Sequence, residues 1–218
     1  TTPGVTGALA LGNTNTTGVI TLSGEDFNTG GAITFTGGSY TVANGSTDLT
    51  IVTSNDAVDF NAGTVTVGNN AFNIDTDTTG GGAGANITFD GKILADTTQV
   101  SGSTVLSDLS FDAGAGTATV TVTDIGYNGT SDVNEINSVA LTGGTISTNG
   151  KINTHTLTNG DKGSVTITGA LSLAGNTTIE TDTAASQTLD GGITITSTTN
   201  ATGSETLTIN SGSGAVDF

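Results

Sequence analysis

The stretch DLTIVTSNDAVDF, residues 48–60, recurs twice later in the chain. Residues 206–218 read TLTINSGSGAVDF, and a looser copy, DLSFDAGAGTATV, spans residues 108–120. The copies begin 60 and 98 residues apart, which fits a repeat of about 20 residues. A repeat of this length is typical of a solenoid, in which each coil buries its apolar side chains against the neighbouring coils.

Short segments between these copies alternate apolar residues with Thr, Ser, Asn or Asp, the period-two pattern of a half-buried strand. The clearest are residues 32–37, 64–68, 86–91, 117–124, 164–175 and 192–198. Gly, Asn and Asp between them suit tight turns, and straight-chain helix formers are scarce. The sequence therefore predicts an all-β solenoid of parallel strands, with about 20 residues per coil and about 11 coils.

Two other fold classes compete with the solenoid. The chain holds 34 Gly in 218 residues, and such a composition also occurs in disordered chains. The regular apolar bursts, which make the chain 33% hydrophobic, argue against disorder. A pair of immunoglobulin-like β-sandwiches, about 100 residues each, would suit the 98-residue gap but not the 60-residue gap.

We expect residues 1–218 to form a single solenoid segment of a longer repetitive chain, because no signal peptide opens the sequence. Residues 75–86 and 126–137 break the strand rhythm and are expected to be projecting loops. Val216 and Phe218 match Val58 and Phe60 in the repeat, so all four are expected in the core. Further coils, or another subunit, are then expected to cover Phe218.

The charge of the chain excludes two classes of partner. Three Lys stand against 20 acidic residues, there is no Arg, and the net charge is −17. Such a chain has no basic patch for nucleic acid or for an anionic membrane surface. No apolar run approaches the roughly 18 residues of a membrane-spanning helix, so membrane insertion is not expected.

The segment GVITLSGEDFNTGGAITFTGGSYTVANG, residues 18–45, resembles the autotransporter-associated β-strand repeat. Comparable places are occupied by Gly18, Leu22, Gly24, Phe27, Gly30, Gly31, Gly37, Tyr40 and Val42. The later LTI and AVDF phrases resemble those of filamentous-haemagglutinin-like bacterial surface proteins. The resemblance implies a right-handed parallel β-helix, extracellular or on the bacterial cell surface, that serves as an adhesin or its stalk. It supplies no catalytic residues.

The expected function is therefore that of a non-enzymatic structural or adhesive surface protein. Its expected partners are copies of itself or further coils at exposed ends, together with host or matrix glycans or proteins. One alternative is a self-assembling extracellular filament subunit that stacks end to end. Another is a carbohydrate-binding or carbohydrate-cleaving β-helix, although dispersed acids and 4% aromatic residues give no coherent site. The single histidine, His155, fits an exposed strand position.

Asp75 and Asp77, in the stretch DTDTT, are the candidate metal ligands. Alternating carboxylates beside a Gly-rich loop offer the oxygen ligands that Ca²⁺ prefers. Glu180 and Asp182 repeat this spacing. The EF-hand spacing and the Gly-rich calcium-binding nonapeptide are missing, so ordinary turn aspartates are the competing interpretation. No other cofactor is expected.

Overall fold

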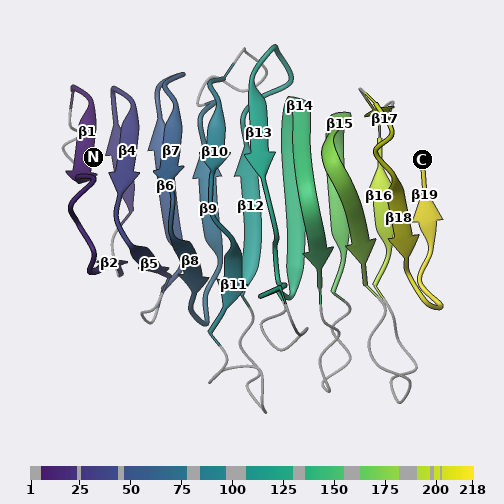
Figure 1. The fold of residues 1–218 in the computed structure, drawn as a ribbon. Helices are drawn as coiled ribbons and strands as arrows, with labels where there is room; N and C mark the ends of the chain where they lie inside the picture. Colours follow the sequence, from purple (N-terminus) through teal and green to yellow (C-terminus); the bar gives the residue numbers. More distant parts are fainter. Residues whose placement is uncertain are drawn as a thin grey trace.

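A computed structural model describes residues 6–23, 26–43, 47–77, 84–96, 107–129, 136–154, 163–181, 191–196, 199–201 and 203–218. Within these ranges every regular element is a strand, and no helix is present that could cross a membrane. The strands stack in sequence order from β1 at one end to β19 at the other (Figure 1). The predicted all-β parallel solenoid is confirmed.

Three rows of parallel strands run along the stack, and each coil adds one strand to each row. Row A holds β1 (Leu9–Gly12), β4 (Ile33–Thr36), β7 (Val58–Asn61), β10 (Ile87–Phe89), β13 (Thr119–Val122), the middle of β14 (Ser138–Asn153), the middle of β15 (Val165–Glu180) and β17 (Thr199–Ala201). A coil is named after the strand that it adds to row A.

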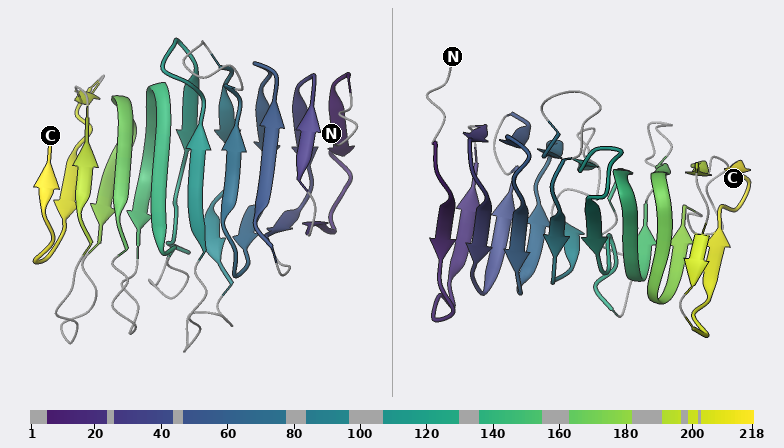
Figure 2. Two further views of the ribbon diagram at one scale, coloured as in Figure 1. Left: turned by 180° about the vertical axis from the view of Figure 1, so that it is seen from behind. Right: turned by 90° about the horizontal axis from the view of Figure 1, so that it is seen from above.

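Rows B and C complete each coil. Row B holds β2 (Val19–Leu22), β5 (Ser39–Val42), β8 (Thr64–Val67), β11 (Ile93–Ala95), the single residue Ile125, the last parts of β14 and β15, and β18 (Leu207–Asn210). Row C holds β3 (Phe27–Thr29), β6 (Leu49–Thr53), β9 (Phe72–Asp75), β12 (Asp108–Asp112), the first parts of β14 and β15, β16 (Ile193–Ile195) and β19 (Val216–Asp217). The two views in Figure 2 show the strands stacked side by side from one end of the molecule to the other.

The coils are longer and fewer than the repeat predicted. Neighbouring strands of one row start about 26 residues apart, so the predicted period of about 20 residues is wrong. In row A, Ile33 pairs with Val58, and Val58 pairs with Ile87. The offset varies because the corners differ in length while the strands keep their register.

The quoted repeat links positions that are only partly equivalent. Leu49 and Leu109 occupy the same place in row C, each paired with Phe72, so the 60-residue gap holds two coils. Leu207 lies in row B instead, paired with Thr177. The repeated sequence therefore marks a strand followed by a corner, and this local pattern occurs in more than one row.

The tandem-sandwich alternative is wrong, because every ladder that the described strands form is parallel. Immunoglobulin-like sandwiches are built from antiparallel sheets. The parallel ladders hydrogen-bond each coil to the next, and the buried hydrophobic residues that the structure describes form one core cluster along the stack.

Inward-facing side chains alternate with outward-facing ones along each strand and fill a narrow core. In the β4, β7 and β10 coils this core is aromatic. Phe35, Phe60 and Phe89 stack face to face along row A, with ring centroids 4.3 and 4.7 Å apart. Phe111 of β12 continues the stack at 4.9 Å from Phe89. The later coils fill the same space with Val, Leu and Ile.

The ends of the repeat differ in burial. Val58 and Phe60 are fully inside row A, whereas Val216 is 40% and Phe218 is 75% exposed. Val216 belongs to row C, where it pairs with Ile193, whereas Val58 and Phe60 belong to row A, so the predicted equivalence of these positions is wrong. That Val216 and Phe218 are core residues covered by further coils or another subunit stays a prediction.

Carboxylates and amides at the start of a strand bind the backbone of the next coil. The side-chain oxygen of Asp48 accepts a hydrogen bond from the N–H of Ala71 at 3.0 Å. Further bonds of this kind run from Thr50 to Asp26, from Thr119 to Asn86, from Lys151 to Asp124 and from Thr206 to Asn176. These side chains satisfy backbone donors at the corners, where the ladder leaves them without a strand partner.

Candidate functional site

Row B is reduced to one residue in the β13 coil. Among the described residues of that coil, only Ile125 pairs with the coil before it, through a bridge to Ile93, while Ile125 and Ile136 bridge to Ile152 and Thr154 of the coil after it. Gly126 follows with a φ of 69°, a left-handed conformation that turns the chain out of the row. The other described coils place strands of three or four residues here. Row B is therefore weakest at Ile125.

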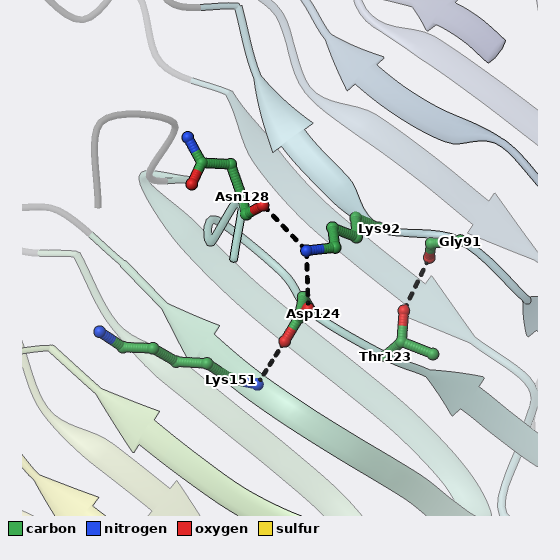
Figure 3. Close-up of polar contacts among 6 residues, drawn as sticks. All are labelled: Gly91, Lys92, Thr123, Asp124, Asn128 and Lys151. Atoms are coloured by element: carbon green, nitrogen blue, oxygen red, sulfur yellow. Dashed lines mark hydrogen bonds and ion pairs between the residues drawn. The ribbon is translucent and has the colours of Figure 1, made fainter. Parts of the chain in front are cut away.

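Asp124, directly before Ile125, links this coil to both of its neighbours (Figure 3). Its Oδ2 lies 3.3 Å from Nζ of Lys92 in the β10 coil. Its Oδ1 accepts a hydrogen bond from the backbone N–H of Lys151 in the β14 coil, at 2.9 Å. One carboxylate thus bridges three consecutive coils at the place where the strand is missing.

Two further bonds strengthen the junction between the β10 and β13 coils. Nζ of Lys92 also donates to the backbone carbonyl oxygen of Asn128 at 2.9 Å. The hydroxyl of Thr123 donates to the carbonyl oxygen of Gly91 at 2.8 Å. Figure 3 shows both contacts next to the Asp124 carboxylate.

Gly150 makes room for the Asp124 carboxylate. A Cβ on Gly150 would overlap Oδ1 of Asp124, and the glycine has a φ of 126°. Both facts disfavour any residue with a side chain at this position. The local sequence is therefore shaped to admit the carboxylate between two strands.

The same surface continues the series of charges toward the C-terminus. Nζ of Lys151 forms an ion pair with Oε2 of Glu180 and lies 5.0 Å from the centre of the Tyr127 ring. Oε1 of Glu180 accepts a hydrogen bond from the side chain of Asn210 at 3.0 Å. We call Lys92, Asp124, Lys151 and Glu180 the polar clamp.

The clamp is suited to holding coils together. Its ion pairs are partly exposed, and such pairs contribute only about 0–1 kcal/mol each. The bond from the Lys151 N–H to Asp124 is charge-assisted, which makes it stronger than a neutral hydrogen bond. Lys92 contacts Asp124, Asp124 contacts Lys151, and Lys151 contacts Glu180, so the four residues form one connected series.

The sequence did not single out the clamp. Lys92, Asp124 and Lys151 are 32 and 27 residues apart, and a period of about 20 residues places them in unrelated positions. Only the observed register, in which Ile93, Ile125 and Ile152 pair in turn, brings the three together.

The structure places the predicted calcium ligands at the end of a strand. Asp75 is the last residue of β9, and its Oδ1 accepts a hydrogen bond from the backbone N–H of Asp77 at 2.8 Å. This is the local bond of an aspartate in a turn. Asp77 forms an antiparallel bridge with Ser54, which places Asp77 beside Ser54 at a corner of the solenoid.

Asp112 of β12 is the acidic neighbour that the sequence did not reveal. It pairs in register with Asp75, and its Oδ1 accepts from the N–H of Gly114 at 2.8 Å. In the part of the chain that the structure describes, no three His, Cys, Asp or Glu side chains form a group able to hold a metal ion. Calcium binding at Asp75 and Asp77 stays a prediction.

A second acidic pair lies on row A. Burial raises the pKa of the Asp59 carboxyl, and the charge of Asp90 raises it further. Oδ1 of Asp59 is shielded from solvent and has no hydrogen-bond partner among the described residues. Burial also raises the pKa of Tyr40, together with the charges of Asp59 and Asp90, although a bond from the Gly37 N–H opposes this shift.

The remaining candidates, His155 and Asp182, lie outside the described residues. No family model, curated protein or solved structure matches the chain. The fold defines the chain as a parallel β-solenoid.

Proposed function

We propose that the chain is a non-enzymatic structural segment of a bacterial surface protein, a rigid stalk or spacer that carries an adhesive part away from the cell. The observation that supports this most directly is the stack of parallel strands in three rows, in which isolated bridges of Ile125 continue row B across the β13 coil. The polar clamp adds side-chain links where row B is thinnest. Together they fit a molecule whose task is to keep its length.

The physical basis is that each coil is stabilised mainly by its nearest neighbours, so a solenoid extends as a rod without needing a larger core. The coil-to-coil bonds of Asp26, Asp48, Asn86, Asp124 and Asn176 add to the backbone ladders. The net charge of −17 favours solubility and discourages side-by-side association of rods.

The cell-surface location and the adhesive role are part of this proposal. They follow from the resemblance of residues 18–45 and of the repeated phrases to bacterial surface proteins. The proposed partners are host or matrix glycans or proteins, along with further coils or copies of the chain at the ends of the stack.

Electron microscopy of the chain with a globular marker protein fused to each end tests the stalk proposal. We expect the two markers to be held apart by a rod with a narrow distribution of separations. Markers that lie together, or at widely scattered separations, would contradict a rigid spacer. Long uniform filaments from the isolated chain would instead favour the end-to-end filament subunit.

The carbohydrate alternative needs a separate measurement, because a rod can also bind or cleave sugars. A glycan array and a reducing-sugar assay on acidic and neutral polysaccharides distinguish the two. The stalk proposal expects no release of reducing ends. Hydrolysis that persists in repurified protein would replace it with an enzymatic function.

A further inference from the structure

We propose that the β13 coil is a built-in bending joint, with row C as its hinge and Asp124 as the latch that keeps it closed. The proposal rests on the stalk function above and adds that the rod is two stiff segments instead of one. Three independent features of the β13 coil carry the argument.

The first feature is the uneven pairing across the junction between the β10 and β13 coils. In row B the junction is the single bridge from Ile93 to Ile125. In row A, β10 and β13 pair through only two residues, Ile87 and Thr88, whereas β4 and β7 pair through four. Rows A and B are therefore thin at the same level of the stack.

The second feature is that row C is at full strength at this level. β12 pairs with β14 through all five of its residues, from Asp108 to Asp112. Oδ1 of Asp108 also accepts hydrogen bonds from the side chains of Asn137 and Ser138, at 2.5 and 2.6 Å. A stack that is strong on one row and thin on the other two bends about the strong row.

The third feature is the change of core at the same level. The stacked aromatic rings run from Phe35 through Phe89 and end at Phe111. The next core residues of rows A and B are Val120, Val122 and Ile125, which are aliphatic. No interlocked ring therefore crosses the junction in rows A and B, and opening it does not require a ring to leave its stack.

The latch lies on the face that must open. Asp124 holds Lys92 on one side and the Lys151 N–H on the other, both on row B. If bending about row C separates the β10 and β13 coils along row B, the contacts of Lys92 with Asp124 and Asn128 break first, and the bond to the Lys151 N–H holds Asp124 in place for reclosure. The clamp then sets how readily the stalk bends under load, and it allows bending without unravelling a coil.

Distance measurements between pairs of spin labels test the joint, and the absence of native Cys makes labelling specific. One pair, at Thr66 and Thr208, spans the junction along row B, and a second pair, at Asn73 and Thr194, spans it along row C. In Asp124→Ala we expect the row B distances to lengthen and their distribution to broaden. The row C distances should stay close to those of the wild type.

The matched control is Asn176→Ala, which removes a side-chain bond to the Thr206 N–H on row B, between the two row B labels. There β15 and β18 pair through four residues, so row B should keep its narrow distribution. If Asp124→Ala does not fold, Lys92→Gln removes the two Nζ contacts, to Asp124 and to the Asn128 carbonyl, and keeps the bond from the Lys151 N–H to Asp124. It should broaden the row B distances to a smaller extent.

Three outcomes would overturn the joint. Row B distances in Asp124→Ala and Lys92→Gln could match the wild type, Asn176→Ala could broaden them equally, or rows B and C could loosen together. The stalk proposal has its own test in the marker-separation experiment, so the two can fail separately. Rods in the microscope with unchanged label distances would leave a stalk without a joint.

Discussion

Aspartate and asparagine at strand starts work as connectors between coils. Asp48 and Asn176 each accept a backbone N–H from the strand one coil later. These short side chains therefore replace missing ladder partners at the corners. From the sequence alone the same residues read as turn formers, which is correct for Asp75 but incomplete for Asp124.

Asp59 offers a pH-dependent test at the residue scale. Because the folded chain raises the pKa of this carboxyl above its unfolded value near 3.9, it binds the proton more tightly than the unfolded chain does. The contribution of Asp59 to the free energy of unfolding should therefore fall as the pH rises from about 4 through the pKa of the folded state. We expect Asp59→Asn to be more stable than the wild type at neutral pH, with the difference vanishing below about pH 4.

Denaturant midpoints measured across this pH range check the expectation. The control is Asp217→Asn, which removes an exposed carboxylate from the surface of row C and should change stability by less than about 0.5 kcal/mol. A variant Asp59→Asn that is less stable than the wild type at neutral pH would contradict the assignment of Asp59 as a destabilising buried charge.

At the scale of the elements, the sequence predicted strands correctly but not the length of a coil. Alternation predicted strands over residues 32–37 and 86–91, and β4 and β10 lie there. The period could not be found in this way, because corner length varies. The hydroxyl of buried Thr29 donates to Gly31, two residues on, whereas that of Thr76 donates to Ala85, nine residues on. Equivalent corners therefore close at different sequence spacings. For the same reason, the residues that lie beside Asp75 and Asp124 in the neighbouring coils cannot be found from a fixed sequence period.

Stacked glycines at the corners explain part of the composition. At the corner between rows A and B, a Cβ on Gly63 would lie 2.8 Å from the carbonyl oxygen of Gly38, and one on Gly91 would overlap the carbonyl oxygen of Gly63. Coils about 4.8 Å apart leave no space there for a side chain. The glycines therefore set how closely successive corners stack.

Gly91→Ala tests this corner. We expect a loss of about 1–3 kcal/mol in the free energy of unfolding, because backbone must move to admit the methyl group. Gly18→Ala is the matched control, since a Cβ there has no neighbour within 4 Å. Equal stability of the two variants in denaturant titrations would show that the corner is looser than described.

At the scale of the whole molecule, the chain is a single stack of parallel coils, each about 26 residues long and bonded chiefly to its neighbours. Such a stack differs mechanically from independent domains. A domain unfolds as one unit, whereas a stack loses coils one at a time from its ends or from a thin row.

Single-molecule force spectroscopy, with the chain pulled by its two ends, tests this claim most directly. Releasing one coil of about 26 residues should lengthen the chain by about 90 Å, and the record should show a series of such steps. Steps of about 70 Å would support the shorter coil of about 20 residues. One or two steps of about 350 Å would indicate compact domains and would contradict the solenoid.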